Sequence, residues 1–288
     1  MSSRSARDKH SHADRLLAVK IYFGGDDAAL VLETGDRRYL IVSDTHLGYE
    51  VELAREGIFF PSQLPSILER ILRLVERFNA DTLVLLGDVK HRVSGVSWRE
   101  SRQVIDLLEG IRSSVDRVLI TPGNHDAGIM TLAQGAAEVM SGRGLMIGDA
   151  WLLHGHCWPP PRAAQARLIV IGHTHPVISL ARGVGSRRKI FLLLRAPRHR
   201  LLKVLAAKTS KSPTRESGYG HGYVKLLVLP HFNNALQGLD LSNLLSGGRS
   251  ISPLLRGDIF NLGAANILML DGARLGSVKW YVESGGQW

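Results

Sequence analysis

Five stretches of the sequence each place metal-binding side chains directly after an apolar run. In chain order they hold Asp44 with His46, Asp88, Asn124 with His125, His154 with His156, and His173 with His175. Carboxylate, amide oxygen and imidazole without thiolate suit manganese, iron or zinc better than a soft metal or a structural zinc ion. One such pair is ordinary turn chemistry. Five of them together predict a metal site.

The number of candidate ligands exceeds what one ion needs. Two divalent ions that share a carboxylate, roughly 3.5–4 Å apart, fit the set better. Such a pair lowers the pKa of water and neutralises phosphoryl oxygens, so the chemistry expected is attack on phosphorus. That reaction also needs a proton donor for the leaving oxygen, and Gly123-Asn124-His125-Asp126 offers a ligand, a donor and a group to orient the donor.

Strands and helices must alternate to position these groups. Residues 28–32 and 39–42 flank a Gly-Asp turn and predict a strand pair. Continuous apolar runs at 82–86, 118–120 and 168–171 predict buried strands. Helical spacing predicts a helix from a Ser62 cap to Phe78 and another over 104–111. In an open α/β sheet, ligands bind just outside the carboxyl ends of the strands, where the five stretches begin.

Shorter sequence patterns predict one further helix and several short strands. Small residues predict a helix over 132–140. The segments predicted as short strands are 145–147, 151–153, 224–229, 266–270 and 277–281. A disordered tail is expected over residues 1–14, followed by one domain over 15–288 that contains a basic, partly mobile segment at about 182–222.

Charge is unevenly distributed along the 288 residues. Residues 1–150 carry 18 basic and 21 acidic side chains, a net charge of −3, whereas residues 151–288 carry 18 and 5, a net charge of +13. The basic half favours a polyanionic partner, either nucleic acid or a nucleotide, with a solvated basic surface as the alternative. The single cysteine allows no internal disulfide and favours the cytoplasm. No apolar run reaches the roughly 20 residues of a membrane span, so no membrane partner is expected.

The motifs in combination resemble a known family. Asp44-x-His46, Gly87-Asp88, Gly123-Asn124-His125-Asp126, His154 and Gly172-His173-x-His175 follow the signature order of calcineurin-like metallophosphoesterases over residues 40–176. Residues 87–91 and 228–233 are similar to a prokaryotic, largely archaeal branch related to SbcD-type nucleases. The resemblance implies an α/β (α+β) fold: a four-layer αββα sandwich of two mixed β-sheets flanked by helices.

The same resemblance implies a role for each matching residue. One ion takes Asp44, His46 and His175. The other takes Asn124, His154 and His173, with Asp88 bridging. His125 is the acid or transition-state donor, oriented by Asp126. His91 contacts the scissile phosphate or leaving group, or else makes a structural hydrogen bond behind the ligands. His156 is not expected to bind metal, and Lys90 is expected to be a surface lysine rather than a phosphate contact. Manganese is the preferred metal, with iron, zinc, nickel and magnesium as alternatives.

Three functions are compatible with this reading. The first is a dinuclear metal-dependent phosphodiesterase that acts as a nuclease on DNA or RNA, motivated by the basic segment. The second is a small-molecule phosphoesterase for nucleotides or cyclic nucleotides, which needs only the metal centre. The third is a non-catalytic scaffold, which would be expected to have lost ligands that are complete here. The chain is too short for the cap of SbcD-type nucleases, unless 183–222 forms a reduced one. The sequence does not determine an oligomeric state.

Overall fold

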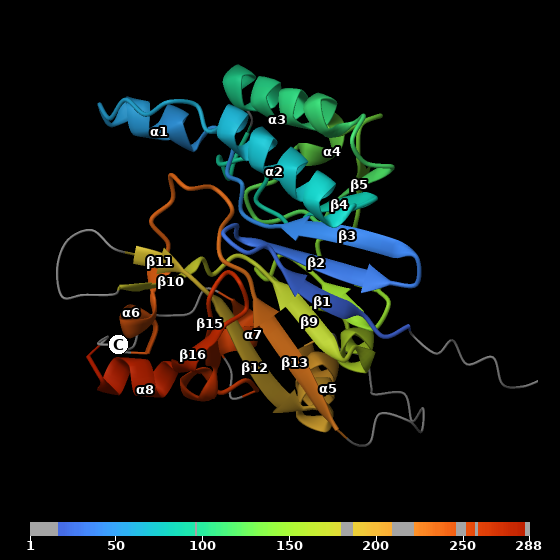
Figure 1. Cartoon of the computed structure of the whole chain (residues 1–288), viewed down its shortest axis with the longest axis vertical. Coiled ribbons are helices and arrows are strands. Elements are labelled where there is room, and N and C mark those ends of the chain that lie inside the picture. The colour runs from blue at the N-terminus through green and yellow to red at the C-terminus, as the bar shows by residue number, and fades with distance from the viewer. Residues whose placement is uncertain are drawn as a thin grey trace, which may run out of the picture.

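Two mixed β-sheets form the centre of the molecule in a computed structural model that describes residues 17–95, 97–179, 187–208, 222–245, 252–256 and 259–285 (Figure 1). The first sheet has six strands, with β3, β4, β5 and β6 parallel to one another. In spatial order its strands are β1 Lys20–Phe23, β2 Ala29–Thr34, β3 Arg37–Val42, β4 Thr82–Leu85, β5 Arg117–Ile120 and β6 Glu138–Val139.

The second sheet has seven strands and a small three-stranded sheet lies beside it. Its strands in spatial order are β16 Arg274–Ser277, β15 Asn266–Leu268, β12 Phe191–Pro197, β13 Tyr223–Val228, β9 Leu168–Ile171, β8 Ala150–Leu152 and β7 Leu145–Ile147. The small sheet consists of β11 Arg187–Lys189, β10 Pro176–Ser179 and β14 Leu239–Asp240.

Helices cover the outer faces of the two sheets (Figure 1). On the first sheet lie α2 Leu64–Phe78, α3 Trp98–Ile111 and the short α4 Ile129–Leu132, with α1 Tyr49–Arg55 beside them. The second sheet packs against α5 Arg198–Lys208, α6 Leu241–Leu245, α7 Pro253–Arg256, α8 Val278–Glu283 and the 3₁₀ turn Pro161–Gln165. A second 3₁₀ turn spans Leu262–Ala264. The predicted αββα sandwich of two mixed sheets is therefore confirmed.

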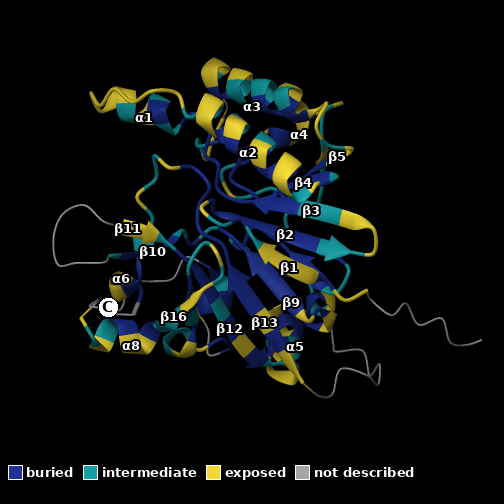
Figure 2. Ribbon diagram, in the orientation of Figure 1, coloured by how far each residue is buried: buried dark blue, intermediate teal, exposed yellow. Residues whose placement is uncertain are grey.

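Side-chain alternation explains why the central strands are apolar throughout. Leu83 and Leu85 of β4 pack under the helices, whereas Val84 and Leu86 face the second sheet. A strand that is buried on both faces has no polar side, as its sequence shows. Figure 2 shows these strands as buried and the outer turns of the helices as exposed.

Two predicted elements are wrong, each for a local physical reason. Residues 132–140 do not form a helix, because Gly135 takes φ +75° and Glu138–Val139 then pairs with β5 as strand β6. Residues 278–281 do not form the predicted strand, because β16 ends at Ser277 and α8 begins at Val278. The Ser277 hydroxyl accepts a hydrogen bond from the Trp280 backbone N–H, which caps α8 and buries Val278 and Tyr281 on one helical face.

Other boundaries differ slightly or lie outside the described residues. The helix predicted from Ser62 begins at Leu64, whose N–H lies 3.4 Å from the Ser62 hydroxyl oxygen. The predicted tail and residues 182–186 and 209–221 of the basic segment are not described. The described part, residues 187–208, forms β11, β12 and α5. Among the helices of the described ranges, none combines the length and apolarity that a bilayer crossing requires.

We predict that the contact between α2 and the first sheet stabilises the whole domain. Ile71 is fully buried in the cluster beneath α2, so Ile71→Ala should lower the free energy of unfolding by about 2–5 kcal/mol. Phe59 is 89% exposed, and Phe59→Ala should change it by less than about 0.5 kcal/mol. Urea unfolding of both variants measures the difference. Equal midpoints would contradict this packing.

Candidate metal centre

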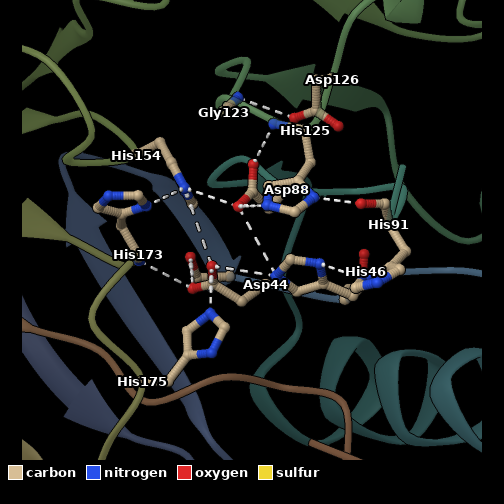
Figure 3. A network of polar contacts seen from close by, with 12 residues as sticks. Asp44, His46, Asp88, His91, Gly123, His125, Asp126, His154, His173 and His175 are labelled. Carbon is tan, nitrogen blue, oxygen red and sulfur yellow. Dashed lines mark hydrogen bonds and ion pairs between the residues drawn. The ribbon is translucent and has the colours of Figure 1, made fainter. Parts of the chain in front are cut away.

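The five predicted stretches meet where strands of both sheets end (Figure 3). Asp44 and His46 follow β3, Asp88 follows β4, and the loop with His125 follows β5, all in the first sheet. The second sheet contributes the loops after β8 and β9. Backbone hydrogen bonds join the first two loops, from Asp44 N–H to the Gly87 carbonyl at 3.1 Å and from His46 N–H to the Asp88 carbonyl at 2.9 Å. The two sheets therefore present one common edge.

Asp44, His46 and His175 form the first group of ligands. Asp44 Oδ1 lies 2.8 Å from His175 Nε2 and 3.8 Å from His46 Nε2. Asp44 is held by its other oxygen, Oδ2, which accepts hydrogen bonds from the Ser43 hydroxyl at 2.6 Å and the His173 N–H at 3.1 Å. One carboxylate oxygen is thus fixed by the protein and the other points toward the two imidazoles.

Asp88, His154 and His173 form the second group. His154 Nε2 lies 3.1 Å from Asp88 Oδ2 and 3.1 Å from His173 Nδ1. The same Asp88 oxygen lies 3.6 Å from His46 Nε2 in the first group. Asp88 therefore stands between the two groups, the position that the family resemblance implies for a bridging carboxylate.

The candidate ligand atoms are arranged for metal coordination rather than for hydrogen bonds with one another. Asp44 Oδ1, His46 Nε2 and His175 Nε2 are buried, yet none of them has a hydrogen-bond partner of acceptable geometry in the described residues. The 2.8 Å approach of Asp44 Oδ1 to His175 Nε2 is short but misaligned. Buried polar atoms without partners are costly. Atoms that converge without pairing are expected where each one points at a shared cation.

Backbone strain is concentrated at the same residues. Among the described residues, six non-glycine residues have positive φ, and five of them are Asp44, His46, Asp88, His173 and His175. Left-handed backbone at such residues costs free energy and persists where the surroundings impose it. Here it turns consecutive side chains toward the same edge of the sheets.

The metal-free pKa values follow from burial and from the two carboxylates. Burial opposes ionisation of Asp44 and Asp88, but the surrounding histidines hold the pKa of both carboxyls below the usual range. Burial also disfavours the His154 cation, yet Asp44 and Asp88 outweigh it and raise the pKa of His154 to about 9. For His46 and His173 burial prevails, and their pKa values fall to about 3 and about 4.

Glycines allow the loops to approach this closely. A Cβ on Gly123 would lie 2.1 Å from Asp88 Oδ1, and one on Gly172 would lie 1.8 Å from the Ser43 hydroxyl oxygen. A Cβ on Gly87 would collide with the His154 ring at 2.4 Å. Each motif glycine is therefore required by contact with the next ligand loop.

Two predicted positions behave differently from the ligand groups. Asn124 is exposed, and no hydrogen bond or ion pair in the described part of the chain joins its side chain to the other ligands. Its assignment to the second ion stays a prediction. His156 lies beside the centre, with its ring 5.5 Å from that of His154 and 6.1 Å from that of His173.

His125 and His91 stand together at the mouth of the centre. His125 Nε2 lies 3.9 Å from Asp88 Oδ2, and the two histidine rings are 5.6 Å apart. No hydrogen bond among the described residues joins the Asp126 carboxylate to the His125 ring, and the orienting role of Asp126 stays a prediction. Asp126 is buried and accepts backbone hydrogen bonds from Val89 at 2.9 Å and Gly123 at 2.8 Å, so it joins two ligand loops instead. The backbone carbonyl of His91 contacts His125 Nδ1.

Lys90 is also placed differently from the expectation of a surface lysine. It is fully buried, and its ammonium group donates to the carbonyl oxygens of Arg92 and Gly95, the latter at 3.3 Å. Burial lowers its pKa. Lys90 therefore supports the loop after His91 and is not a phosphate contact.

The loop after β13, within the stretch 228–233 that resembles the nuclease-related branch, supports the ligands, a role that the sequence did not predict. His231 is buried, with its ring 5.2 Å from that of His175. Phe232 N–H donates to the Ser43 carbonyl at 2.8 Å, and the Asn233 amide donates to the Thr45 carbonyl at 2.9 Å. The signal was available, because His231 and Asn233 follow the apolar strand β13 just as the other ligands follow theirs.

A hollow of about 380 Å³ opens beside His91 and His125. Arg55 and Arg92 line it together with Glu52, whose carboxylate lies 3.2 Å from His91 Nε2. The hollow therefore gives access to His91 and His125, and two arginines line it.

Comparison with known proteins places these features in context. Residues 37–177 match the family model described as calcineurin-like phosphoesterase. No curated protein matches the sequence. The chain is similar in structure to the nuclease MPE of Pseudomonas putida, with 18% identity, a TM-score of 0.49 and coverage of 90% of this chain and 100% of that one.

Two further solved structures are similar over about half of the chain. They are the protein of unknown function AQ665 from Aquifex aeolicus and the phosphoesterase YfcE from E. coli. The first has 19% identity, a TM-score of 0.35 and coverage of 48% of this chain and 78% of that one. The second has 18% identity, a TM-score of 0.33 and coverage of 54% and 86%. These likenesses are too weak to assign an activity.

We predict that metal binding releases a proton from His154. Below its pKa of about 9 this imidazole is protonated in the metal-free protein, and a metal ion must displace that proton. His46 and His173 are already neutral at pH 7 and release none. Release of about one proton is expected from these three histidines, with affinity falling as pH drops from 9 to 6. Titration calorimetry in buffers of different ionisation enthalpy measures the protons. An affinity that does not change with pH would contradict this.

We predict that Gly123→Ala disables the centre without unfolding the chain. Its Cβ would displace the Asp88 carboxylate, so manganese affinity should fall about 10–100-fold. Gly263→Ala is the matched control, because its Cβ would come no closer than 3.4 Å to another atom. Calorimetry gives the affinity and circular dichroism the fold. Unchanged affinity in Gly123→Ala would reject the close contact between these loops.

Proposed function

The chain belongs to the calcineurin-like phosphoesterase family of metal-dependent phosphoric ester hydrolases, and from this premise we propose that it hydrolyses phosphodiester bonds in nucleic acid. The position of Asp88 is the main support for phosphodiester hydrolysis. One oxygen of this carboxylate lies within 3.6 Å of His46 and 3.1 Å of His154, so the two ligand groups share it. A pair of divalent ions held there would activate water and neutralise phosphoryl oxygens.

His125 is the residue we assign to the leaving group. Its ring faces the accessible hollow, its Nε2 lies 3.9 Å from Asp88 Oδ2, and its Nδ1 contacts the His91 carbonyl. A carbonyl at Nδ1 favours the proton on that nitrogen in the neutral ring, and Nε2 carries the second proton in the cation. His125 can therefore donate from Nε2 to a phosphoryl or leaving oxygen in the hollow.

Positive charge around the hollow supports an anionic substrate. Arg55 and Arg92 line it, and guanidinium groups bind phosphate through paired N–H donors. The described basic residues 187–189 lie in β11, which pairs with β10 directly after the ligand His175. Nucleic acid has phosphates spaced to meet several such groups at once.

The rest of the described basic segment lies elsewhere. β12 runs antiparallel to β13, which is parallel to β9, so β12 leads away from the metal centre. Its length of about 20 Å separates α5 from the ligand loops. The arginines and lysines of α5 therefore do not line this hollow. Phe191, the aromatic residue noted in the basic segment, is fully buried and cannot stack on a base.

Because the basic residues of α5 lie away from the metal centre, a small-molecule substrate is the second candidate. The hollow of about 380 Å³ suits a nucleotide, and the metal centre needs nothing from α5. Manganese is the native metal that we propose, because the ligand set contains carboxylate and imidazole without thiolate. The cytoplasm is the proposed location, because the single cysteine allows no internal disulfide. The scaffold alternative has no support, because the described His and Asp groups are complete.

We predict manganese-dependent cleavage of labelled oligonucleotides. Asp88→Asn should reduce turnover at least 100-fold because it removes the shared carboxylate, and His125→Ala about 10²–10⁴-fold because it removes the proton donor. A chelator should abolish activity, and added manganese should restore it. Gly263→Ala serves as the control variant.

Two results would overturn parts of this proposal. Robust hydrolysis of a small diester such as bis(4-nitrophenyl) phosphate without oligonucleotide cleavage would favour the small-molecule candidate. Full activity in both Asp88→Asn and His125→Ala would show that the centre is not responsible.

A further inference from the structure

A second hollow, of about 430 Å³, lies apart from the metal-ligating side chains. Its walls are the turn between β1 and β2, strand β11 and the turn between β15 and β16. Its charged lining residues are Asp26, Arg187, Arg188, Lys189 and Asp271. It thus lies where the two large sheets and the small sheet come together.

The cations of β11 at this hollow are not neutralised by acidic partners. Lys189 donates to the Phe232 and Asn233 carbonyls at 3.2 and 3.1 Å and to the Asn234 side-chain oxygen at 2.7 Å. Arg187 bonds to the side-chain oxygen of Gln237 at 3.2 Å. Arg188 is exposed, and no ion pair within the described residues involves it. All their partners are neutral oxygens. Burial lowers the pKa of Lys189 to about 7, so the positive charge that remains available to a ligand is that of Arg187 and Arg188.

The helix behind the hollow adds more positive charge. Arg70 and Arg73 both pair with Asp27, at 2.6 and 2.9 Å, and Arg70 also donates to the Phe232 carbonyl that Lys189 contacts. Arg77 donates to the Gly24 carbonyl at 3.2 Å. The arginines in and near this hollow, Arg70, Arg73, Arg77, Arg187 and Arg188, therefore outnumber the nearby acids Asp26, Asp27, Glu69 and Asp271 by one. An anion would relieve that imbalance.

Residues 231–234 form a single segment that lies between this hollow and the metal centre. On one side His231 packs on the ligand His175, and Asn233 bonds to the loop that carries Asp44 and His46. On the other side, Lys189 bonds to residues 232–234. Residues 231–234 would therefore separate a ligand in this hollow from the loops that carry Asp44, His46 and His175.

We propose that this second hollow binds a phosphate group. Its arginines Arg187 and Arg188 suit phosphate oxygens, and its neighbour is the candidate metal centre of a phosphoesterase family. Resting on the proposed function, the phosphate belongs to the nucleic-acid strand beyond the bond that is cut. A free nucleotide or phosphate ion carries the same chemistry and is the other source.

The test reverses the charge of one exposed residue. Arg188→Glu is compared with Arg112→Glu, an exposed arginine at the C-terminal end of α3. With the manganese-loaded full chain, Arg188→Glu should raise KM for a single-stranded oligonucleotide roughly fivefold and leave kcat within twofold. It should also reduce the slope of log KM against log salt by about one. Neither variant should change KM for bis(4-nitrophenyl) phosphate.

A calorimetric titration with inorganic phosphate distinguishes the two sources. The wild-type chain should show a second binding event that Arg188→Glu lacks. Loss of that event with unchanged oligonucleotide KM identifies free phosphate or nucleotide as the ligand. Identical kinetics and identical titrations in wild type and Arg188→Glu overturn the proposal. If the wild type cleaves no ester at all, the proposed function fails, and the phosphate titration alone decides the second hollow.

Discussion

Two buried carboxylates set the constraint on which this structure depends. Asp44 and Asp88 are almost fully buried, and both stay ionised because imidazoles surround them. Burying such charges without partners is costly, and one protonated histidine between them, His154, is a small compensation for two. A pair of divalent cations removes this imbalance. The metal centre is therefore the element that makes the junction of the two sheets electrostatically acceptable.

The ligand loops give up conformational freedom to reach that arrangement. Five ligands have left-handed backbone, and three glycines stand where a Cβ would strike the next loop. Strain of this kind persists when packing on every side imposes it. The packing comes from apolar strands buried on both faces, with helices outside and the partner sheet inside. The rigid sandwich thus supplies the free energy that the irregular loops need.

Residues 231–234 connect the centre to the rest of the molecule. They hold the Asp44 loop through Phe232 and Asn233, and are themselves held by Arg70 and Lys189. The Arg70 guanidinium also lies 3.9 Å above the Phe232 ring. Basic side chains in this region therefore have a structural function in addition to any contact with a substrate. Net charge alone does not separate these roles, because α5 carries four Lys and Arg residues and β11 three, yet α5 follows the end of β12 that lies away from the metal centre.

The sequence by itself determined the central strands, the fold class and the Asp and His residues that the structure brings together as candidate ligands. Apolar runs that end in glycine and a polar group are a local pattern, and Asp88 or His154 can be recognised from it. Only the tertiary structure decided which atoms meet. In the folded chain, Asp126 accepts hydrogen bonds from the Val89 and Gly123 backbone, and Lys90 is buried. His231 packs against His175, and α5 lies away from the centre. These outcomes depend on strand direction and on contacts between separate loops, such as Asp126 with Val89 and His231 with His175, which lie 37 and 56 positions apart, and no local pattern encodes either.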